Sequence, residues 1–166
     1  MHARYKFNFT DGRYMKHTTV CYMEDNGSYL MLHRIKKIND ENHDKWIGIG
    51  GKLEAGESPF ECVRREVAEE VGLTLNSLRY AGFITFVSDL YGTEYMHLFH
   101  SNDFSGVLPE NCSEGVPAWV RKEDVVNLPI WEGDKIFLNL LNTEKRFFSL
   151  KLVYQKDRLI SHTLEF

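Results

Sequence analysis

The sequence predicts a single α+β domain in which helices cover a mixed sheet. Segments typical of strands far outnumber the two segments with a helical pattern, and most of the strands lie between those two helices. The 166 residues are enough for one domain with a sizeable core, and no repeat, linker or low-complexity segment divides them.

The first part of the chain reads as strands separated by turns. Asp11-Gly12 and Asp25-Asn26-Gly27 are turn signals between alternating or β-rich segments. Residues 36–45 are polar without periodicity and are expected to form a loop. The strands expected in this part are residues 4–9, 16–23, 29–35 and 46–50.

A helix is expected to follow the loop 51–57. Ser58 suits the N-cap and Pro59 the first helical position, while Glu61 completes a capping box. Gly72 suits a left-handed stop. The apolar stripe that should anchor this helix to the sheet consists of Phe60, Val63, Val67 and Val71.

The second part repeats this alternation of strands and one helix. Residues 134–142 have the pattern of an amphipathic helix, and residues 106–115 form a polar loop. The strands expected here are residues 78–87, 94–99, 118–121, 147–154 and 159–164.

Composition excludes several classes of partner. The net charge is −4 and no Lys/Arg cluster could follow a polyanion, so we expect no long nucleic acid, although a small phosphorylated ligand stays possible. No apolar run approaches the ~20 residues of a membrane helix, and the N-terminus lacks a signal-peptide pattern. Cys21, Cys62 and Cys112 form no CxxC pair, which favours reduced thiols and a cytoplasmic protein. The oligomeric state stays open.

Three acidic residues of the first helix point to a metal. Glu66, Glu69 and Glu70 have i, i+3, i+4 spacing, which costs a bare helix roughly 0.2–0.5 kcal/mol per like-charged pair. A hard divalent cation would relieve this repulsion, and oxygen ligands favour Mg²⁺ or Mn²⁺ over zinc. Taken alone, the cluster is more typical of a solvated acidic face.

The surroundings favour the metal. Arg65 can orient a carboxylate such as Glu57 or Glu69, and Lys52 can meet a phosphate as a point charge. The glycines at 48, 50 and 51 let backbone groups approach a ligand closely.

Residues 51–73 resemble the signature of the Nudix hydrolases, the Nudix box. All nine fixed positions of that signature are present: Gly51, Glu57, Arg65, Glu66, Val67, Glu69, Glu70, Gly72 and Leu73. The resemblance implies the Nudix fold, an α/β/α sandwich with a mixed β-sheet and the box as loop-helix-loop. It also implies metal-dependent hydrolysis of a nucleoside diphosphate linked to another group.

The resemblance further implies roles for single residues. Mg²⁺ would be bound by Glu66, Glu69, Glu70 and the Gly50 carbonyl, with Glu57 and Arg65 bracing the loop and helix. A carboxylate then takes the proton of the attacking water. The candidates are Glu66 and Glu114, since many family members place an extra acidic ligand or base in the loop that contains Glu114. An ordinary loop carboxylate is the alternative for Glu114.

Residues 17–160 are similar to MutT-type Nudix hydrolases of oxidised purine nucleoside triphosphates such as 8-oxo-dGTP, especially Gram-positive bacterial members. Residues 1–16 are therefore an N-terminal extension, expected to be a strand packed on the domain, and residues 17–166 are the single Nudix domain. The resemblance implies that Phe86 and Trp131 hold the base, that Asp134 reads its edge and that Arg34 meets the triphosphate. Phe86 and Trp131 could instead be ordinary core residues.

Two departures from that branch concern the base. Gly133 stands where one base-reading Asp is expected, and Ile47 replaces a base-reading Asn. The preferred reading is a Mg²⁺-dependent pyrophosphohydrolase of a small nucleotide, most simply an oxidised purine triphosphate. The alternatives are hydrolysis of ADP-ribose, a dinucleoside polyphosphate or capped RNA, or a non-catalytic Nudix module that senses nucleotides.

Overall fold

A computed structural model describes residues 15–166 of the chain. The strand expected over 4–9, the turn at Asp11-Gly12 and most of the expected extension lie outside the described residues. The first described strand, β1 (Met15–Asp25), begins two residues before the expected start of the domain at 17. The division into extension and domain therefore stays a prediction.

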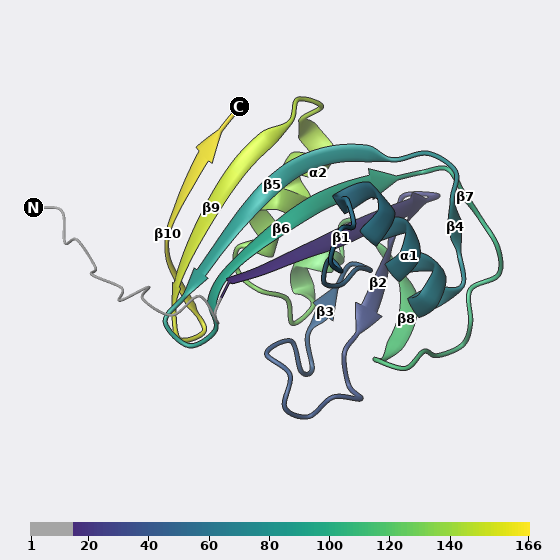
Figure 1. Cartoon of the computed structure of the whole chain (residues 1–166), viewed down its shortest axis with the longest axis horizontal. Coiled ribbons are helices and arrows are strands. Elements are labelled where there is room, and N and C mark those ends of the chain that lie inside the picture. The colour runs from purple at the N-terminus through teal and green to yellow at the C-terminus, as the bar shows by residue number, and fades with distance from the viewer. Residues whose placement is uncertain (1–14) are drawn as a thin grey trace, which may run out of the picture.

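Within residues 15–166, an eight-stranded mixed sheet runs in the order β10-β9-β5-β6-β1-β2-β3, and the eighth strand, β8, also pairs with β2 (Figure 1). β1 is parallel to β6 and β5 is parallel to β9, whereas the other pairs are antiparallel. The remaining strands are β2 (Ser28–His33), β3 (Trp46–Ile47), β5 (Arg79–Ser88), β6 (Gly92–Ser101), β8 (Val116–Arg121), β9 (Phe148–Gln155) and β10 (Arg158–Glu165).

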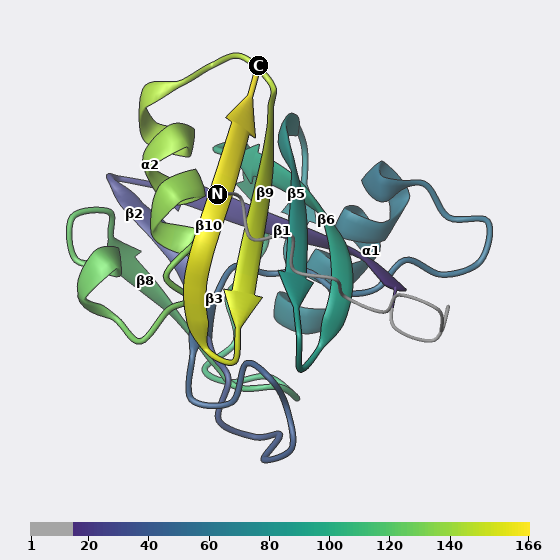
Figure 2. The same cartoon turned by 90° about the vertical axis from the view of Figure 1, so that its left-hand side faces the viewer.

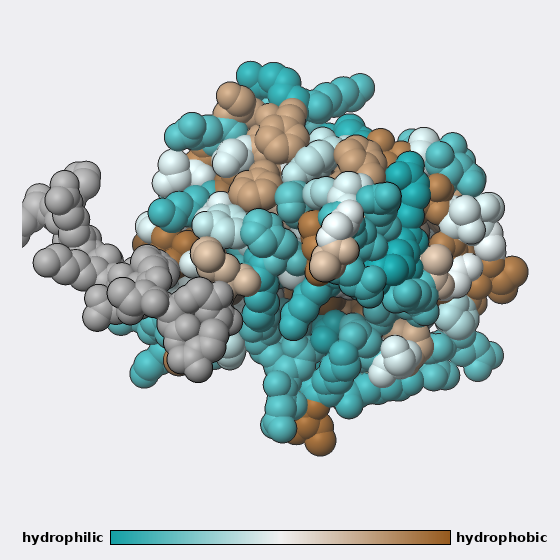
Figure 3. Space-filling model, viewed as in Figure 1, coloured by the Kyte–Doolittle hydropathy of each residue, from teal (hydrophilic) through white to brown (hydrophobic). Residues whose placement is uncertain are grey.

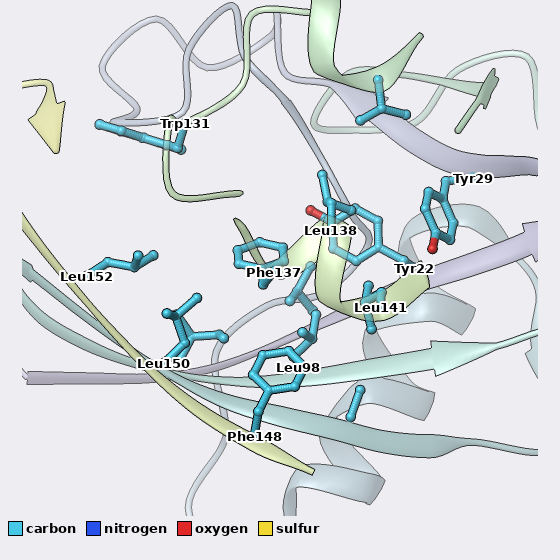
Figure 4. Close-up of a cluster of buried hydrophobic side chains, with 14 of the residues drawn as sticks. Tyr22, Tyr29, Leu98, Trp131, Phe137, Leu138, Leu141, Phe148, Leu150 and Leu152 are labelled. Atoms are coloured by element: carbon cyan, nitrogen blue, oxygen red, sulfur yellow. The ribbon is translucent and has the colours of Figure 1, made fainter. Parts of the chain in front are cut away.

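Two helices lie on opposite sides of this sheet, α1 (Pro59–Val71) and α2 (Asp134–Thr143) (Figure 2). Successive side chains of β1 point to opposite faces of the sheet, so this strand contributes to the core on each side. Val20 and Tyr22 belong to the core under α2, and Cys21 and Met23 belong to the core under α1. The core under α2 also contains aromatic and leucine side chains of α2 and β9 (Figure 4). The predicted α/β/α sandwich with a mixed sheet is confirmed.

Helix α1 follows its local sequence signals closely. Both hydrogen bonds of the capping box form between Ser58 and Glu61, and Gly72 ends the helix with φ 65°. One expectation was wrong: Phe60 is 38% exposed at the edge of the stripe, whereas Cys62 is buried. The Phe60 ring still packs edge-on against Phe99, with centroids 5.0 Å apart.

Short elements differ most from the sequence-based expectations. Of the strand expected at 46–50, only Trp46–Ile47 forms a regular strand, β3. Beyond it, Ile49 and Lys52 form isolated bridges to β1. Three short elements were not predicted: β4 (Thr74–Leu75), β7 (Phe104–Ser105) and a 3₁₀ turn at Val125–Asn127. In the described part of the chain, no helix has the length and apolar character needed to span a membrane.

Candidate active site

A cleft of about 790 Å³ opens beside the loop that joins β2 to β3. Seen from the side of Figure 1, hydrophilic side chains cover the lower part of the molecule, where this loop lies (Figure 3). The lining of the cleft includes two sets of residues, called here the two ends of the cleft. The first is mainly charged and consists of Arg34, Gly50, Gly51, Lys52, Glu66 and Glu114. The second contains the aromatic rings and consists of Phe86, Glu94, Met96, Trp131, Asp134 and Phe137. The structure therefore brings most of the predicted site residues to one cleft.

Arg65 ties the loop of the Nudix-like segment to helix α1. Its guanidinium donates two hydrogen bonds to Glu57, of 2.7 and 2.9 Å, and one of 2.8 Å to Glu66. It also reaches Glu69 at 3.2 Å and the Lys52 carbonyl at 3.1 Å. A planar fork with five donors suits this multiple role, which a lysine could not fill.

Glu57 is held in its ionised form by these contacts. The hydrogen bonds from Arg65, followed by the hydrogen bond from the backbone N–H of Glu54, lower the pKa of Glu57 to about 2. The carboxylate therefore stays ionised and paired with Arg65 throughout the neutral pH range.

Glu70 and Glu114 form a pair of neighbouring carboxyl groups. Burial, together with the charge of Glu114, raises the pKa of Glu70 to about 7. Burial also acts to raise the pKa of Glu114, but the hydrogen bond from Lys37 and the charge of Arg34 outweigh it and lower that pKa. Cys112 lies at 3.7 Å from Glu70. Two neighbouring acidic groups form a natural place for a cation to replace the proton.

The backbone near Glu66 is shaped to bring oxygen atoms together. The carbonyls of Ile49 and Gly51 accept hydrogen bonds from β1, so the Gly50 carbonyl between them points away from that strand. A Cβ atom on Gly51 would lie only 2.4 Å from the Glu66 carboxyl carbon. Glycine at this position therefore lets Glu66 approach the loop.

The donor set fits a hard divalent cation, because it consists of carboxylates and one carbonyl. Among residues 15–166, however, no three acidic, histidine or cysteine side chains are already gathered as a preformed metal cluster. Glu69 is the most remote member, since its side chain is 63% exposed and bonded to Arg65. Glu66, Glu70, Glu114 and the Gly50 carbonyl are the groups best placed to hold the ion.

Arg34 is less free than expected for a phosphate ligand. Its guanidinium pairs with Asp40 at 2.5 Å and with Glu114. Lys52 is exposed and lines the same end of the cleft. Lys52 is thus the more available cation for a phosphate in this arrangement.

The other end of the cleft combines aromatic rings with acid. Trp131 belongs to the core cluster but stands at its margin (Figure 4), with Phe86 edge-on at 5.5 Å. The Trp131 indole N–H donates to Asn42 at 2.8 Å, and the Lys45 ammonium lies 4.6 Å over the ring. Core packing and a role in the cleft are therefore both compatible with Trp131.

Asp134 is a buried acid that faces the cleft. It is 9% exposed, and no side chain or backbone N–H of the described residues donates a hydrogen bond to its carboxyl group. Burial, and then the charge of Glu94, raises the pKa of Asp134 to about 8. The carboxyl group borders the cleft, where a ligand donor can reach it.

The two departures noted in the sequence lie at this end. Gly133 donates its N–H to the Tyr154 hydroxyl at 2.7 Å, and a Cβ atom there would lie 2.6 Å from Leu152. A longer side chain at 133 therefore has no room unless these neighbours move. Ile47 lines the cleft as an apolar residue.

Several residues of the cleft are not among those predicted from the sequence. Glu94 had a usable signal, because it shares an otherwise apolar strand face with Met96 and Leu98. Lys37 and Asp40 had none, since only the fold of the polar loop brings them to Glu114 and Arg34.

Comparison with known proteins gives a consistent set of relatives. Residues 13–141 match the NUDIX domain family. The chain is 32% identical over 124 residues to the oxidized purine nucleoside triphosphate hydrolase of Danio rerio, covering 73% of this chain and 78% of that protein. It is 28% identical over 157 residues to the Bacillus subtilis (strain 168) Nudix hydrolase YvcI, described as uncharacterized, and the match covers 92% of this chain and 96% of that protein. The crystal structure of a MutT protein from Bacillus halodurans superposes on this chain with a TM-score of 0.80 at 28% identity. The match covers 90% of this chain and 97% of the Bacillus halodurans protein.

Proposed function

Because the chain belongs to the Nudix hydrolase family, whose members act on phosphorus-containing anhydrides, we propose that it is a Mg²⁺-dependent pyrophosphohydrolase of purine nucleoside triphosphates. Oxidised purines such as 8-oxo-dGTP are the preferred substrates in this proposal. The products are the nucleoside monophosphate and pyrophosphate, and the cellular role is to keep damaged nucleotides out of DNA.

The observation that carries the proposal is the division of one cleft into two chemically different ends. Carboxylates, a free carbonyl and Lys52 line one end, and aromatic rings with a buried acid line the other. A nucleoside triphosphate has the same division, with an anionic chain and a flat polar base. An aromatic face against a base contributes roughly 1–3 kcal/mol, which makes Phe86 and Trp131 useful there.

The residues of the anionic end have separate tasks. Arg65 fixes Glu57, Glu66 and Glu69, so the carboxylates keep their positions when the substrate enters. When bound, Mg²⁺ neutralises the phosphates and lowers the pKa of a water molecule. Glu66, Glu70, Glu114 and the Gly50 carbonyl would hold the ion. Glu66 and Glu114 remain the candidates to accept the proton of the attacking water.

The relatives named for oxidised purine hydrolysis favour this substrate class, although their identity is low. ADP-ribose, a dinucleoside polyphosphate or capped RNA would be alternative substrates. The net charge of −4 disfavours the RNA version. A non-catalytic module that senses nucleotides is disfavoured by the intact set Glu66, Glu69 and Glu70, which a binding-only domain is free to lose.

The test is a turnover screen with Mg²⁺ and product identification. Substrates are 8-oxo-dGTP, dGTP, ADP-ribose, a dinucleoside polyphosphate and capped RNA. We expect 8-oxo-dGTP to have the highest kcat/KM and to yield pyrophosphate. Glu70→Gln should lose activity by a factor of ~10² or more while staying folded, whereas Glu61→Gln, an exposed carboxylate of the same helix, should stay active. Preferred cleavage of another substrate would overturn the proposed specificity, and full Mg²⁺-dependent turnover by Glu70→Gln would overturn the metal assignment.

A further inference from the structure

We propose that Glu94 reads the purine base together with Asp134, and that it supplies the acidic contact that position 133 cannot provide. This inference rests on the proposed function, because it concerns the base end of the same cleft. It assigns a specificity-determining role to a residue of β6 that lies outside the Nudix-like segment.

The fold directs Glu94 into the cleft. On β6, Glu94 alternates with residues that face the other side of the sheet, and it shares its face with Met96 and Leu98. Leu98 belongs to the core under α2, and Met96 packs against the same core. In the register of the sheet, Glu94 lies directly opposite Phe86 on β5. Its carboxyl group is therefore next to one of the rings expected to hold the base.

The hydrogen bonds of Glu94 leave one oxygen free for a ligand. Thr18 donates to Oε1 at 2.6 Å, which fixes the side chain. No described residue donates to Oε2, and none donates to either oxygen of Asp134. The nearby ammonium of Lys16 is already paired with Glu41 at 2.8 Å. Two carboxyl groups on opposite elements, β6 and α2, thus line one cleft with unused hydrogen-bonding capacity.

Burial shifts the pKa of both carboxyl groups upward. Burial raises the pKa of Glu94, and the charge of Glu41 adds to this, although Thr18 opposes it. Burial, with Glu94 next in effect, raises the pKa of Asp134 to about 8. A protonated carboxyl group offers one donor and one acceptor, whereas an ionised one only accepts. Such a pair matches the edge of a purine that presents ring N–H, amino and carbonyl groups side by side.

The packing around Gly133 explains why the second acid comes from β6. A side chain at 133 would collide with Leu152 and with the Tyr154 hydroxyl, which already accepts the Gly133 N–H. The loop before α2 can therefore offer one acid, Asp134, and the facing strand β6 offers the other.

The test compares base selectivity in matched variants. For the wild type, Glu94→Gln and Glu94→Leu, kcat and KM are measured with 8-oxo-dGTP, dGTP, dATP and dCTP. We expect Glu94→Leu to lower kcat/KM for the preferred purine about tenfold or more, mainly through KM, and to change dCTP hydrolysis less than threefold. Glu94→Gln, which keeps a donor and an acceptor, should lose less.

Glu24→Gln is the control, because Glu24 is also a partly buried strand carboxylate held by hydrogen bonds, but it does not line the cleft. It should leave the purine-to-pyrimidine ratio unchanged. The affinity of each protein for the corresponding monophosphates, measured by calorimetry, reports base recognition independently of turnover. A wild type that hydrolyses no purine triphosphate would overturn the proposed function, whereas equal losses for purine and pyrimidine in both assays would overturn the role of Glu94.

Discussion

Asp134 is a buried acid, and we propose that its burial serves a ligand rather than the fold. Its carboxyl group is 9% exposed and lacks a donor among the described residues. Because the folded chain raises its pKa to about 8 from an ordinary value of 3.8, the folded state binds a proton that the unfolded state releases between these two values. The free energy of unfolding must therefore fall as the pH rises through this window.

We expect Asp134→Asn to stabilise the protein in a pH-dependent manner. Below pH ~4 the wild-type carboxyl is protonated in both states, so the two proteins should be about equally stable. Towards pH 8 the variant should gain ~1 kcal/mol or more, since each pKa unit corresponds to about 1.4 kcal/mol. Urea denaturation at pH 4, 6 and 8 measures this, with Asp124→Asn, an exposed acid, as the control. A pH-independent difference would contradict the burial argument.

Gly51 is a second position at which a single atom matters. We expect Gly51→Ala to reduce kcat about tenfold or more, because the new Cβ atom would displace the Glu66 carboxyl group, now 2.4 Å from that point. Stability should change by less than ~1 kcal/mol, since the far end of a flexible side chain can move. Steady-state kinetics and thermal unfolding of the same preparation separate the two effects. Wild-type kcat would show that Glu66 does not need this close approach.

Helix α1 was predictable from sequence because its signals are local. Ser58, Glu61 and Gly72 act within one or two turns of the chain, and the structure contains both cap bonds and the left-handed stop. The two-residue strands β4 and β7 were not predictable, since two residues cannot show a period and their pairing depends on distant chain. Phe60 was assigned to the buried stripe because helical spacing does not reveal where the sheet beneath a helix ends.

For the candidate site, too, the parts that depend on local sequence were predictable and the parts that depend on distant chain were not. The Nudix signature locates Glu57, Arg65 and the acidic residues in one segment at fixed spacing. Periodicity places Glu94 on the apolar face of its strand, but the pairing of β6 with β1 and β5 that brings it to the cleft is not specified by the sequence pattern. The Nudix segment is thus encoded locally, whereas Arg34, Glu114 and the half of the cleft expected to hold the base are brought together by tertiary structure.

The cap of α1 gives a prediction at the scale of this element. Ser58→Ala should lower stability by about 0.5–2 kcal/mol, because the N–H of Glu61 loses its acceptor. Ser58→Asp should restore most of it, since an acid is an equally good cap and suits the positive end of the helix. Chemical denaturation measures both variants. If Ser58→Ala were as stable as the wild type, tertiary packing alone would hold the first turn.

At the scale of the whole molecule, the cleft joins elements from both sides of the sheet. Glu66 comes from α1 on one side, and Asp134 comes from α2 on the other. The strand β1 passes between them and contributes to both cores. A ligand that fills the cleft therefore links the two layers through contacts that the empty protein lacks.

This arrangement predicts that metal and nucleotide stabilise the protein through separate ends of the cleft. A ligand at 100 times its Kd adds about 2.7 kcal/mol to the free energy of unfolding. For a domain of this size that corresponds to a Tm increase of roughly 5–10 °C. The experiment measures Tm with Mg²⁺, with a purine triphosphate analogue carrying an α,β-methylene bridge, and with both together.

Two variants that each convert one carboxyl to an amide distinguish the ends. Glu70→Gln should lose the Tm increase caused by Mg²⁺, while Asp134→Asn should keep it and lose most of the increase caused by the nucleotide. In the wild type, both ligands together should raise Tm by more than the sum of the separate increases, because a triphosphate and a cation at the same end of the cleft attract each other. Equal Tm increases in the wild type and both variants would mean that the ligands bind elsewhere, and the two-ended cleft would then not be the nucleotide site.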